Sequence, residues 1–360
     1  MRAADVFVIG GGPAGLTAAI AARLKGLDVT VVEAARPPVD RACGEGILPE
    51  GVEVLRQLGI SLSTVEAFPF RGIRFLQEGA SVEASFPFGC GLAMRRTLLH
   101  EILASRAVEL GVRLFWGARI TDASELPPCR WIVGADGQNS RVRRAGGLDA
   151  PGRASWRFGF RRHYAIAPWS DFVQVHWGSR CQIYVTPVSP GEIGVALLSR
   201  DPHLRLDGAL SEFPELRQRL RGVETSSSER GAVTASRRLC RVFRGRTVLI
   251  GDASGSVDAI TGQGLSLSFH QAVAMSEALC SGDLTSYQAE HSRLARRPVF
   301  AANVLLSLDR FPWLRRSVVR ILAYHPQIFA KLLQFGVAES RSSLRLPNEE
   351  WRLLPFHKRS

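Results

Sequence analysis

The sequence is poor in lysine, lacks paired cysteines and contains no long apolar run. Only three of its 46 basic residues are lysines (Lys25, Lys331 and Lys358), so arginine carries almost all of the formal net charge of +13. The six cysteines are scattered without a C-x-x-C pair, which argues against a zinc site and against a disulfide framework. No run of about 20 apolar residues predicts a transmembrane helix. No nucleic-acid-binding module is present, so we expect no nucleic-acid partner despite the basic charge.

The two ends of the chain bear on its location. Asp5 and the glycines that begin at Gly10 interrupt the apolar N-terminus too early for a signal peptide, which favours a cytoplasmic protein. Residues 296–337 mix arginines with leucines and aromatic residues in a helical pattern. Such helices bind the membrane surface, cover a lipid substrate as a lid, or form an ordinary solvated cap. The first alternative predicts peripheral contact with the cytoplasmic face of a membrane.

The N-terminal residues predict a dinucleotide-binding βαβ unit. Residues 4–9 read as a buried strand, residues 13–25 as a helix and residues 28–33 as a second strand. Between the first strand and the helix lies Gly-Gly-Gly-Pro-Ala-Gly at positions 10–15, which fits G-x-G-x-x-G. The glycines allow a tight turn and a close approach to a pyrophosphate at the helix N-terminus. Glu33 ends the second strand, where a carboxylate accepts hydrogen bonds from the adenosine ribose.

Two later motifs decide between NAD and FAD. Residues 134–143 (Gly-Ala-Asp-Gly-Gln-Asn-Ser-Arg-Val-Arg) resemble the "DG" motif of the aromatic-hydroxylase-type FAD oxidoreductases. Residues 251–255 (Gly-Asp-Ala-Ser-Gly), continuing to residues 261–265 (Thr-Gly-Gln-Gly-Leu), resemble the "GD" motif of the same superfamily. That superfamily includes flavin hydroxylases, flavin halogenases and geranylgeranyl reductases. The three motifs occur in the family order, and the resemblance covers roughly residues 1–285 and implies non-covalently bound FAD.

The resemblance also implies roles for individual residues. Asp252 matches the aspartate that binds a ribitol hydroxyl, and residues 262–264 begin a helix whose amides face the flavin pyrimidine edge. Asp136 matches an aspartate between the cofactor and pyridine-nucleotide regions, or is a plain turn aspartate. Arg96, or alternatively Arg95, matches the arginine that reaches the phosphates. The expected cofactor-binding residues are Gly10, Gly12, Pro13, Ala14, Gly15, Glu33, Ala34, Cys43, Gly44, Arg95, Arg96, Asp136, Gly137, Gly251, Asp252, Gly262, Gln263, Gly264 and Leu265.

The branch of the superfamily is suggested by residues 43–46 (Cys-Gly-Glu-Gly), which resemble the geranylgeranyl-reductase branch. In the family this loop runs beside the isoalloxazine ring. Cys43 is therefore a substrate contact or part of a proton relay, and Glu45 a general acid or base. The alternatives are a buried filler and a solvated loop acid. The segment from Tyr184 to Pro187 lacks the Trp and Phe of the usual prenyl-reductase pattern, which argues against an isoprenoid substrate.

The middle of the chain supplies the expected substrate side. Residues 156–199 are rich in strand-forming and aromatic residues, and within them Tyr184 and His176 carry polar tips that would orient a phenol or carbonyl. We expect both to be catalytic, together with Cys43 and Glu45. Halogenases of this superfamily use an active-site lysine, and no lysine lies in the middle of the chain.

These observations predict an α/β protein with a discontinuous, three-layer, Rossmann-like FAD-binding domain, an inserted mixed β-sheet and a C-terminal helical segment. The predicted FAD-binding segments are residues 1–70, 92–150 and 240–283; the inserted segments are 71–91 and 151–239; the helical region is 284–360. The favoured activity is an NAD(P)H-driven monooxygenase that hydroxylates a lipophilic aromatic or polyketide-type substrate. The alternatives are a reductase of isoprenoid double bonds and a non-catalytic flavin-binding partner. In each catalytic case the flavin carries the difficult chemistry.

Overall fold

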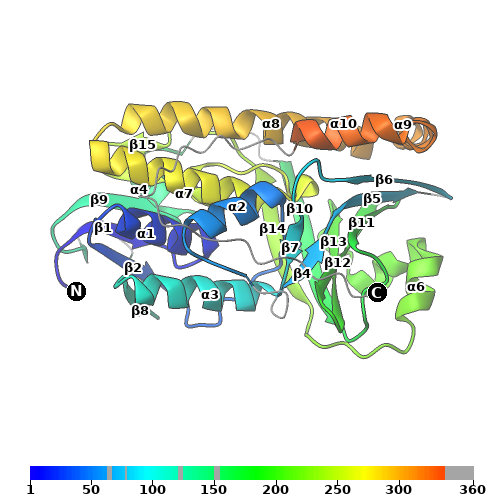
Figure 1. Cartoon of the computed structure of the whole chain (residues 1–360), viewed down its shortest axis with the longest axis horizontal. Coiled ribbons are helices and arrows are strands. Elements are labelled where there is room, and N and C mark those ends of the chain that lie inside the picture. Colours follow the sequence, from blue (N-terminus) through cyan, green and yellow to red (C-terminus); the bar gives the residue numbers. More distant parts are fainter. Residues whose placement is uncertain (63–66, 78, 121–124, 150–154, 337–360) are drawn as a thin grey trace.

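A six-stranded sheet occupies the N-terminal side of the molecule in the computed structural model, which describes residues 1–62, 67–77, 79–120, 125–149 and 155–336 (Figure 1). All its neighbouring strands are parallel except the edge pair β15–β16. The strand order is β15 (Phe243–Arg244), β16 (Thr247–Leu249), β9 (Cys129–Gly134), β1 (Ala4–Ile9), β2 (Val29–Glu33) and β8 (Arg113–Trp116). β2 is buried along its whole length, as expected for a central parallel strand covered on both faces.

Three helices cover one face of this sheet: α1 (Pro13–Leu24), α3 (Arg96–Glu109) and α7 (Gly264–Ser281). α1 begins at Pro13 because proline lacks the N–H that the first helical turn leaves unpaired. Its small residues let α1 and α7 pack closely, and both contribute to the largest apolar core. A second apolar cluster around Phe7 and Val32 closes the other face. This is the predicted three-layer arrangement.

A seven-stranded mixed sheet forms the other side of the molecule (Figure 1). Its strand order is β14 (Arg230–Ser236), β10 (Ser155–Tyr164), β13 (Glu192–Ser199), β12 (Cys181–Ser189), β11 (Phe172–Trp177), β5 (Gly72–Gln77) and β6 (Ala80–Ser85). Only β11 and β5 pair in parallel. The short helices α5 (Leu206–Ala209) and α6 (Pro214–Leu220) cover one face with apolar side chains. Pro214 begins α6, since a proline is tolerated in the first turn of a helix.

The remaining elements connect these sheets. A three-stranded sheet has the order β3 (Gly46–Ile47), β7 (Gly91–Ala93) and β4 (Phe68–Phe70), and the short helices α2 (Pro49–Gln57) and α4 (Arg141–Ala145) flank it and the first sheet. The C-terminal helices α8 (Leu284–Arg310), α9 (Pro312–Tyr324) and α10 (Pro326–Gly336) run along the upper edge in Figure 1. No helix among the described residues is long and apolar enough to cross a bilayer. The rest of the predicted C-terminal region, residues 337–360, lies outside the described residues, and the domain boundaries stay a prediction.

Candidate active site

The three sequence motifs meet at the carboxyl edge of the parallel sheet. The backbone N–H of Ala135 donates to the carbonyl of Ile9 at 2.8 Å, which places the motif after β9 beside the turn after β1. A Cβ on Gly10 would lie 2.3 Å from the Ala135 oxygen. A Cβ on Gly251 would lie 2.8 Å from the Cβ of Ala14. Glycine is therefore required where the three segments touch. Ligands of open α/β sheets bind at this edge.

Four glycines at this edge face open space, and we call them the open glycines: Gly12, Gly44, Gly262 and Gly264. A Cβ added to any of them would meet no protein atom within 4 Å. Gly12 precedes α1, and Gly264 begins α7, so each lies at a helix N-terminus where backbone N–H groups are unpaired. Gly15 differs, because its Cβ would lie 1.8 Å from the oxygen of Gly10. The arrangement leaves room for a phosphate-bearing ligand at two positive helix ends.

Glu33 holds the first turn in shape. It is 8% exposed, and its two carboxylate oxygens accept the backbone N–H groups of Gly11 at 2.7 Å and Ala35 at 2.8 Å. Ala34 is exposed beside it. His100 of α3 supports the turn from the other side, since its Nε2 lies 3.0 Å from the Gly11 oxygen. Burial lowers the pKa of His100, so its neutral imidazole donates the Nε2 hydrogen to this carbonyl.

A carboxylate and two arginines line the same edge. Solvent reaches the Asp252 side chain, yet protein atoms surround it closely enough that desolvation raises the pKa of its carboxyl. The charges of Arg96 and Arg41 lower that pKa in part. The Nε of Arg96 is buried and has no hydrogen-bond partner among the described residues. Such an unpaired guanidinium donor beside open glycines suits a phosphate oxygen.

Arg95 has a different role from Arg96. Its guanidinium pairs with Glu192 on β13 and reaches the backbone oxygen of Ser226 at 3.2 Å. The structure thus favours Arg96 as the residue available to a cofactor. Asp136 accepts the backbone N–H groups of Arg141 at 2.6 Å and Val142 at 3.2 Å, so one of its oxygens supports the start of α4.

Glu45 belongs to a buried network between the loop of residues 40–45 and the mixed sheet. One carboxylate oxygen accepts the backbone N–H of Arg96 at 2.9 Å, and the other lies 2.6 Å from Nε2 of His163. Arg161 pairs with Asp40 and lies 3.7 Å from Glu45. Glu45 is 3% exposed and has a φ of 60°, a left-handed conformation that is costly for a non-glycine residue. Its contacts hold it in that conformation.

Both ring nitrogens of His163 are engaged. Nε2 lies 2.6 Å from a Glu45 oxygen, and Nδ1 lies 2.8 Å from the Ser227 hydroxyl and 3.0 Å from a guanidinium nitrogen of Arg161. Glu45, with both carboxylate oxygens engaged and buried, is placed to position its loop, and its expected role as a general acid or base stays a prediction. It holds the Cys43–Gly44 loop, where the Cys43 sulfur accepts the Glu45 N–H at 3.4 Å.

Tyr184 and His176 lie on opposite faces of the mixed sheet. Tyr184 pairs with Val175 in the register of β11 and β12, and its hydroxyl donates to the Ile260 oxygen at 3.0 Å, close to the turn that precedes α7. His176 pairs with Ile183 and packs against Phe213 beside α6, at 6.0 Å between ring centroids. Burial lowers the pKa of His176 to about 4, so its imidazole is neutral. The structure therefore does not bring His176 to the cofactor side.

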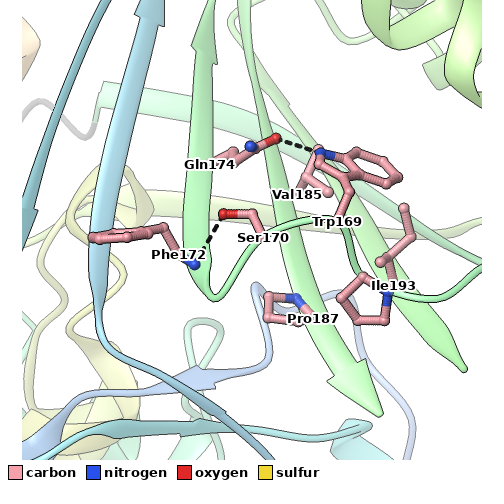
Figure 2. Close-up of a pocket in the computed structure, with 8 residues that line it drawn as sticks. Trp169, Ser170, Phe172, Gln174, Val185, Pro187 and Ile193 are labelled. Atoms are coloured by element: carbon pink, nitrogen blue, oxygen red, sulfur yellow. Dashed lines mark hydrogen bonds between the residues drawn. The ribbon is translucent and has the colours of Figure 1, made fainter. Parts of the chain in front are cut away.

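A small cavity in the mixed sheet is separate from this edge. Its volume is ≈ 10 Å³, and Figure 2 shows Gln174 accepting the Trp169 indole N–H at 3.0 Å beside it. A cavity of that size holds about one water molecule and no organic substrate.

The sequence comparison agrees with this geometry. Residues 3–125 and 118–295 match the family described as "FAD binding domain". The chain belongs to this family. The open glycines, the helix N-termini and the unpaired Arg96 nitrogen fit FAD, and the protein is an FAD-dependent oxidoreductase of the aromatic-hydroxylase superfamily, as the motifs predicted.

Two curated relatives illustrate the range of the superfamily. The menaquinone reductase of Mycolicibacterium smegmatis is 26% identical, covering 86% of this chain and 86% of the relative. The 12-dehydrotetracycline 5-monooxygenase/anhydrotetracycline 6-monooxygenase of Streptomyces rimosus is 28% identical, covering 88% of this chain and 73% of the relative.

Solved structures confirm the fold. A geranylgeranyl bacteriochlorophyll reductase-like protein from Thermoplasma acidophilum superposes with a TM-score of 0.74 at 21% identity, covering 95% of this chain and 98% of the other. The flavin-dependent brominase Bmp2 gives a TM-score of 0.73 at 20% identity, covering 92% and 98%. The described lysines here do not suit halogen transfer, because Lys25 ends α1 near Glu277 and Lys331 is exposed on α10.

Two residues at the site escaped sequence reasoning. Arg41 approaches Gly137, with a nitrogen 3.2 Å from the position of a Cβ there, and its charge acts on Asp252. His100 binds the Gly11 carbonyl from a helix 89 positions along the chain. Arg41 lies two positions before Cys43 in the same loop, and that position was the one available signal for it. His100 lies in an ordinary amphipathic helix, and no sequence signal marked it as a site residue.

Proposed function

We propose that the protein is a monooxygenase that uses NAD(P)H and O2 to hydroxylate a lipophilic aromatic, polyketide-type substrate. The balanced reaction consumes one NAD(P)H, one proton and one O2, and one oxygen atom enters the substrate while the other leaves as water. FAD supplies the redox chemistry when it is bound. The residues of the chain bind and orient the reactants and exclude water.

The observation that carries the proposal is the hydroxyl of Tyr184, which borders an apolar cluster between the mixed sheet and α8. The cluster includes Val175, Trp177 and Ile260, and leucines of α8 pack against it. Burial raises the pKa of the Tyr184 phenol, so it stays protonated. Because its hydrogen goes to the Ile260 oxygen, its own oxygen is available to accept a hydrogen bond from a substrate phenol.

The relatives support oxygenation of such substrates, since several are named monooxygenases: the Streptomyces rimosus enzyme above, an anhydrotetracycline monooxygenase and a 6-methylpretetramide 4-monooxygenase. A second activity, reduction of an isoprenoid double bond, is favoured by a different observation. The menaquinone reductase matches over 86% of its own length, whereas a quarter of the tetracycline enzyme has no counterpart here. The two activities differ in what they add to the substrate.

Product mass separates them. The FAD-loaded protein is incubated in air with NADPH and either a long-chain alkyl phenol or a menaquinone, and the products are examined by mass spectrometry. The proposal predicts a gain of one oxygen, with the label derived from ¹⁸O2. A gain of two hydrogens in the prenyl side chain of the menaquinone, retained after the quinol is reoxidised to the quinone and formed under anaerobic conditions as well as in air, would establish the reductase instead. Tyr184→Phe is expected to raise KM for phenolic substrates while leaving FAD binding intact.

A further inference from the structure

The C-terminal helices carry most of the exposed large apolar side chains. Nine of the fourteen such side chains in the described part of the chain lie between residues 300 and 335. On α9, Trp313 is 68% exposed and Tyr324 is 83% exposed. Tyr324 lies eleven positions after Trp313, close to three full helical turns, so both are on one face of the helix. The opposite face, with Val319 and Leu322, packs on β6. The exposed aromatics are therefore not needed to hold α9 in place.

The apolar side chains of α8 and α10 belong to the same surface. Ile328, Leu332 and Phe335 follow each other at helical spacing on α10 and are all exposed. Phe335 contacts Phe300 of α8 at 5.8 Å between ring centroids. We call the exposed side of α8, α9 and α10 the helical face; it forms the upper edge in Figure 1. Monomeric proteins rarely expose apolar surface of this extent without a partner.

Charge identifies the kind of partner. Residues 296–336 contain seven basic residues, of which Arg315 is buried, and one acid, Asp309. Asp309 is turned inward to Arg157 and also pairs with Arg200, while Arg320 and Lys331 are exposed beside the aromatics. A second copy of the chain would bring the same positive charge to the contact. Anionic lipid headgroups complement it, and Trp and Tyr favour the interface between headgroups and acyl chains.

The helical face is joined to the cofactor edge. The last residue of α10, Gly336, accepts a hydrogen bond at 3.0 Å from the side-chain nitrogen of Gln263. Gln263 lies between the open glycines Gly262 and Gly264. Leu305 and Leu308 of α8 pack beside Tyr184 on the inner side of the same layer. A molecule entering from the helical face would thus meet the substrate side of the site within one layer of helices.

We propose that α8, α9 and α10 seat the enzyme on an anionic lipid bilayer and that its lipophilic substrate enters from that bilayer. The second half of this statement rests on the proposed function. The first half, that α8, α9 and α10 bind the bilayer, is independent of the proposed function because it depends only on the helical face.

Vesicle binding of the full-length, FAD-loaded protein tests whether the helical face binds a membrane. Binding is measured by flotation with vesicles of phosphatidylcholine, with and without phosphatidylglycerol. Binding only to the anionic vesicles is expected. Replacement of two basic residues, Arg320→Glu with Lys331→Glu, is expected to weaken binding by about 25-fold or more, from roughly fivefold per basic residue. The matched control is Arg217→Glu with Arg221→Glu on and after α6, which changes the net charge equally and is expected to bind normally.

A second pair of variants tests the aromatic contact. Acyl-chain-brominated lipid is expected to quench tryptophan emission, and Trp313→Phe is expected to remove most of that quenching although six other tryptophans remain. Val108→Ser, at a side chain 59% exposed on α3, is the control for loss of an exposed apolar group and should leave binding unchanged. The proposal would be overturned if the protein failed to bind anionic vesicles. It would also be overturned if the control variants weakened vesicle binding as much as the variants of the helical face. Sedimentation as a dimer that Trp313→Ser converts to a monomer would overturn it too, since a second copy would then occupy the face.

Turnover distinguishes the failure of this inference from the failure of the proposed function. With substrate dissolved in the vesicles, the proposal predicts that Arg320→Glu with Lys331→Glu lowers turnover about as much as it lowers binding. With substrate in detergent micelles the same variant should turn over normally. Normal vesicle binding with no oxygenated product would refute the proposed function alone. Normal product formation with no vesicle binding would refute only the binding of the helical face to a bilayer.

Discussion

Replacing Gly12 with alanine separates cofactor binding from folding. Gly12 has a φ of −74° and a ψ of 179°, which an alanine adopts without strain, and a Cβ there meets no protein atom within 4 Å. Alanine is a poorer N-cap than glycine, and this cost is offset by the smaller entropy of the unfolded chain. The free energy of unfolding of the apoprotein should therefore change by less than about 1 kcal/mol.

The added methyl group would nevertheless occupy the space through which a pyrophosphate approaches the N-terminus of α1. Each hydrogen bond that the N–H groups lose to a charged phosphate is worth roughly 1.5–3 kcal/mol. Loss of one such bond predicts a Kd for FAD about 10- to 150-fold higher than in the native protein. Binding is measured by titrating the apoprotein with FAD and following flavin fluorescence, and stability by thermal melting without FAD.

Two other glycines serve as controls. Gly191, in the turn between β12 and β13, also has open space around it, and Gly191→Ala should change neither FAD affinity nor melting. Gly15→Ala should lower the Tm of the apoprotein, because its Cβ would lie 1.8 Å from the Gly10 oxygen. The reasoning is refuted if Gly12→Ala binds FAD like the native protein, or if it destabilises the apoprotein as much as Gly15→Ala.

Three further substitutions follow from the same structure. Asp252→Asn should weaken FAD binding about tenfold or more by removing a charged acceptor, whereas Asp171→Asn, an exposed surface change, should not; flavin fluorescence titration compares the two. Burial raises the pKa of Glu50 from 4.5 to about 7, so its contribution to stability is present below about pH 4.5 and is lost as the pH rises through 7. Glu50→Gln should therefore stabilise the protein by roughly 3 kcal/mol near pH 8 and by little near pH 4. Chemical unfolding at the two pH values measures this difference. An equal effect at both would contradict a raised pKa of Glu50 as the cause. Glu45→Ala should destabilise the protein by about 3–5 kcal/mol, because it leaves buried partners of the network unpaired; unfolding in urea measures it, and a change below 1 kcal/mol would show that the network is not closed as described.

The dinucleotide turn and its partner motifs were predictable because each depends on local geometry. Gly10, Gly12 and Gly15 are needed wherever a strand turns tightly into a helix, so their spacing alone locates the turn. The other motifs follow buried strands of the same parallel sheet, and such strands end at one edge. The meeting of all three motifs therefore required no knowledge of side-chain packing.

The environment of Glu45 was not predictable in the same way. Its partner His163 lies 118 positions further along the chain, on a strand whose antiparallel pairing no local pattern specifies. The sequence shows a glutamate between two glycines and is silent on whether its carboxylate faces solvent, substrate or another domain. Burial and two hydrogen bonds hold the carboxylate against the mixed sheet, and its acid–base role stays a prediction.

The faces of Tyr184 and His176 depend on register. Side chains alternate along a strand, and residues paired across two strands share a face. The turn between β11 and β12 pairs Val175 with Tyr184, so His176 must point the other way. One residue more or fewer in that turn would have reversed the outcome. The aromatic and polar pattern of residues 156–199 holds no information on that length, which is why the two residues were grouped together.

The central claim is that the open glycines, with Arg96 and Asp252, bind FAD non-covalently. The most direct test is a visible absorption spectrum of the purified protein, recorded before and after addition of FAD and removal of the excess by gel filtration. We expect flavin absorption bands that stay with the protein and that acid precipitation releases as free FAD. A protein that remains colourless after incubation with FAD would contradict it.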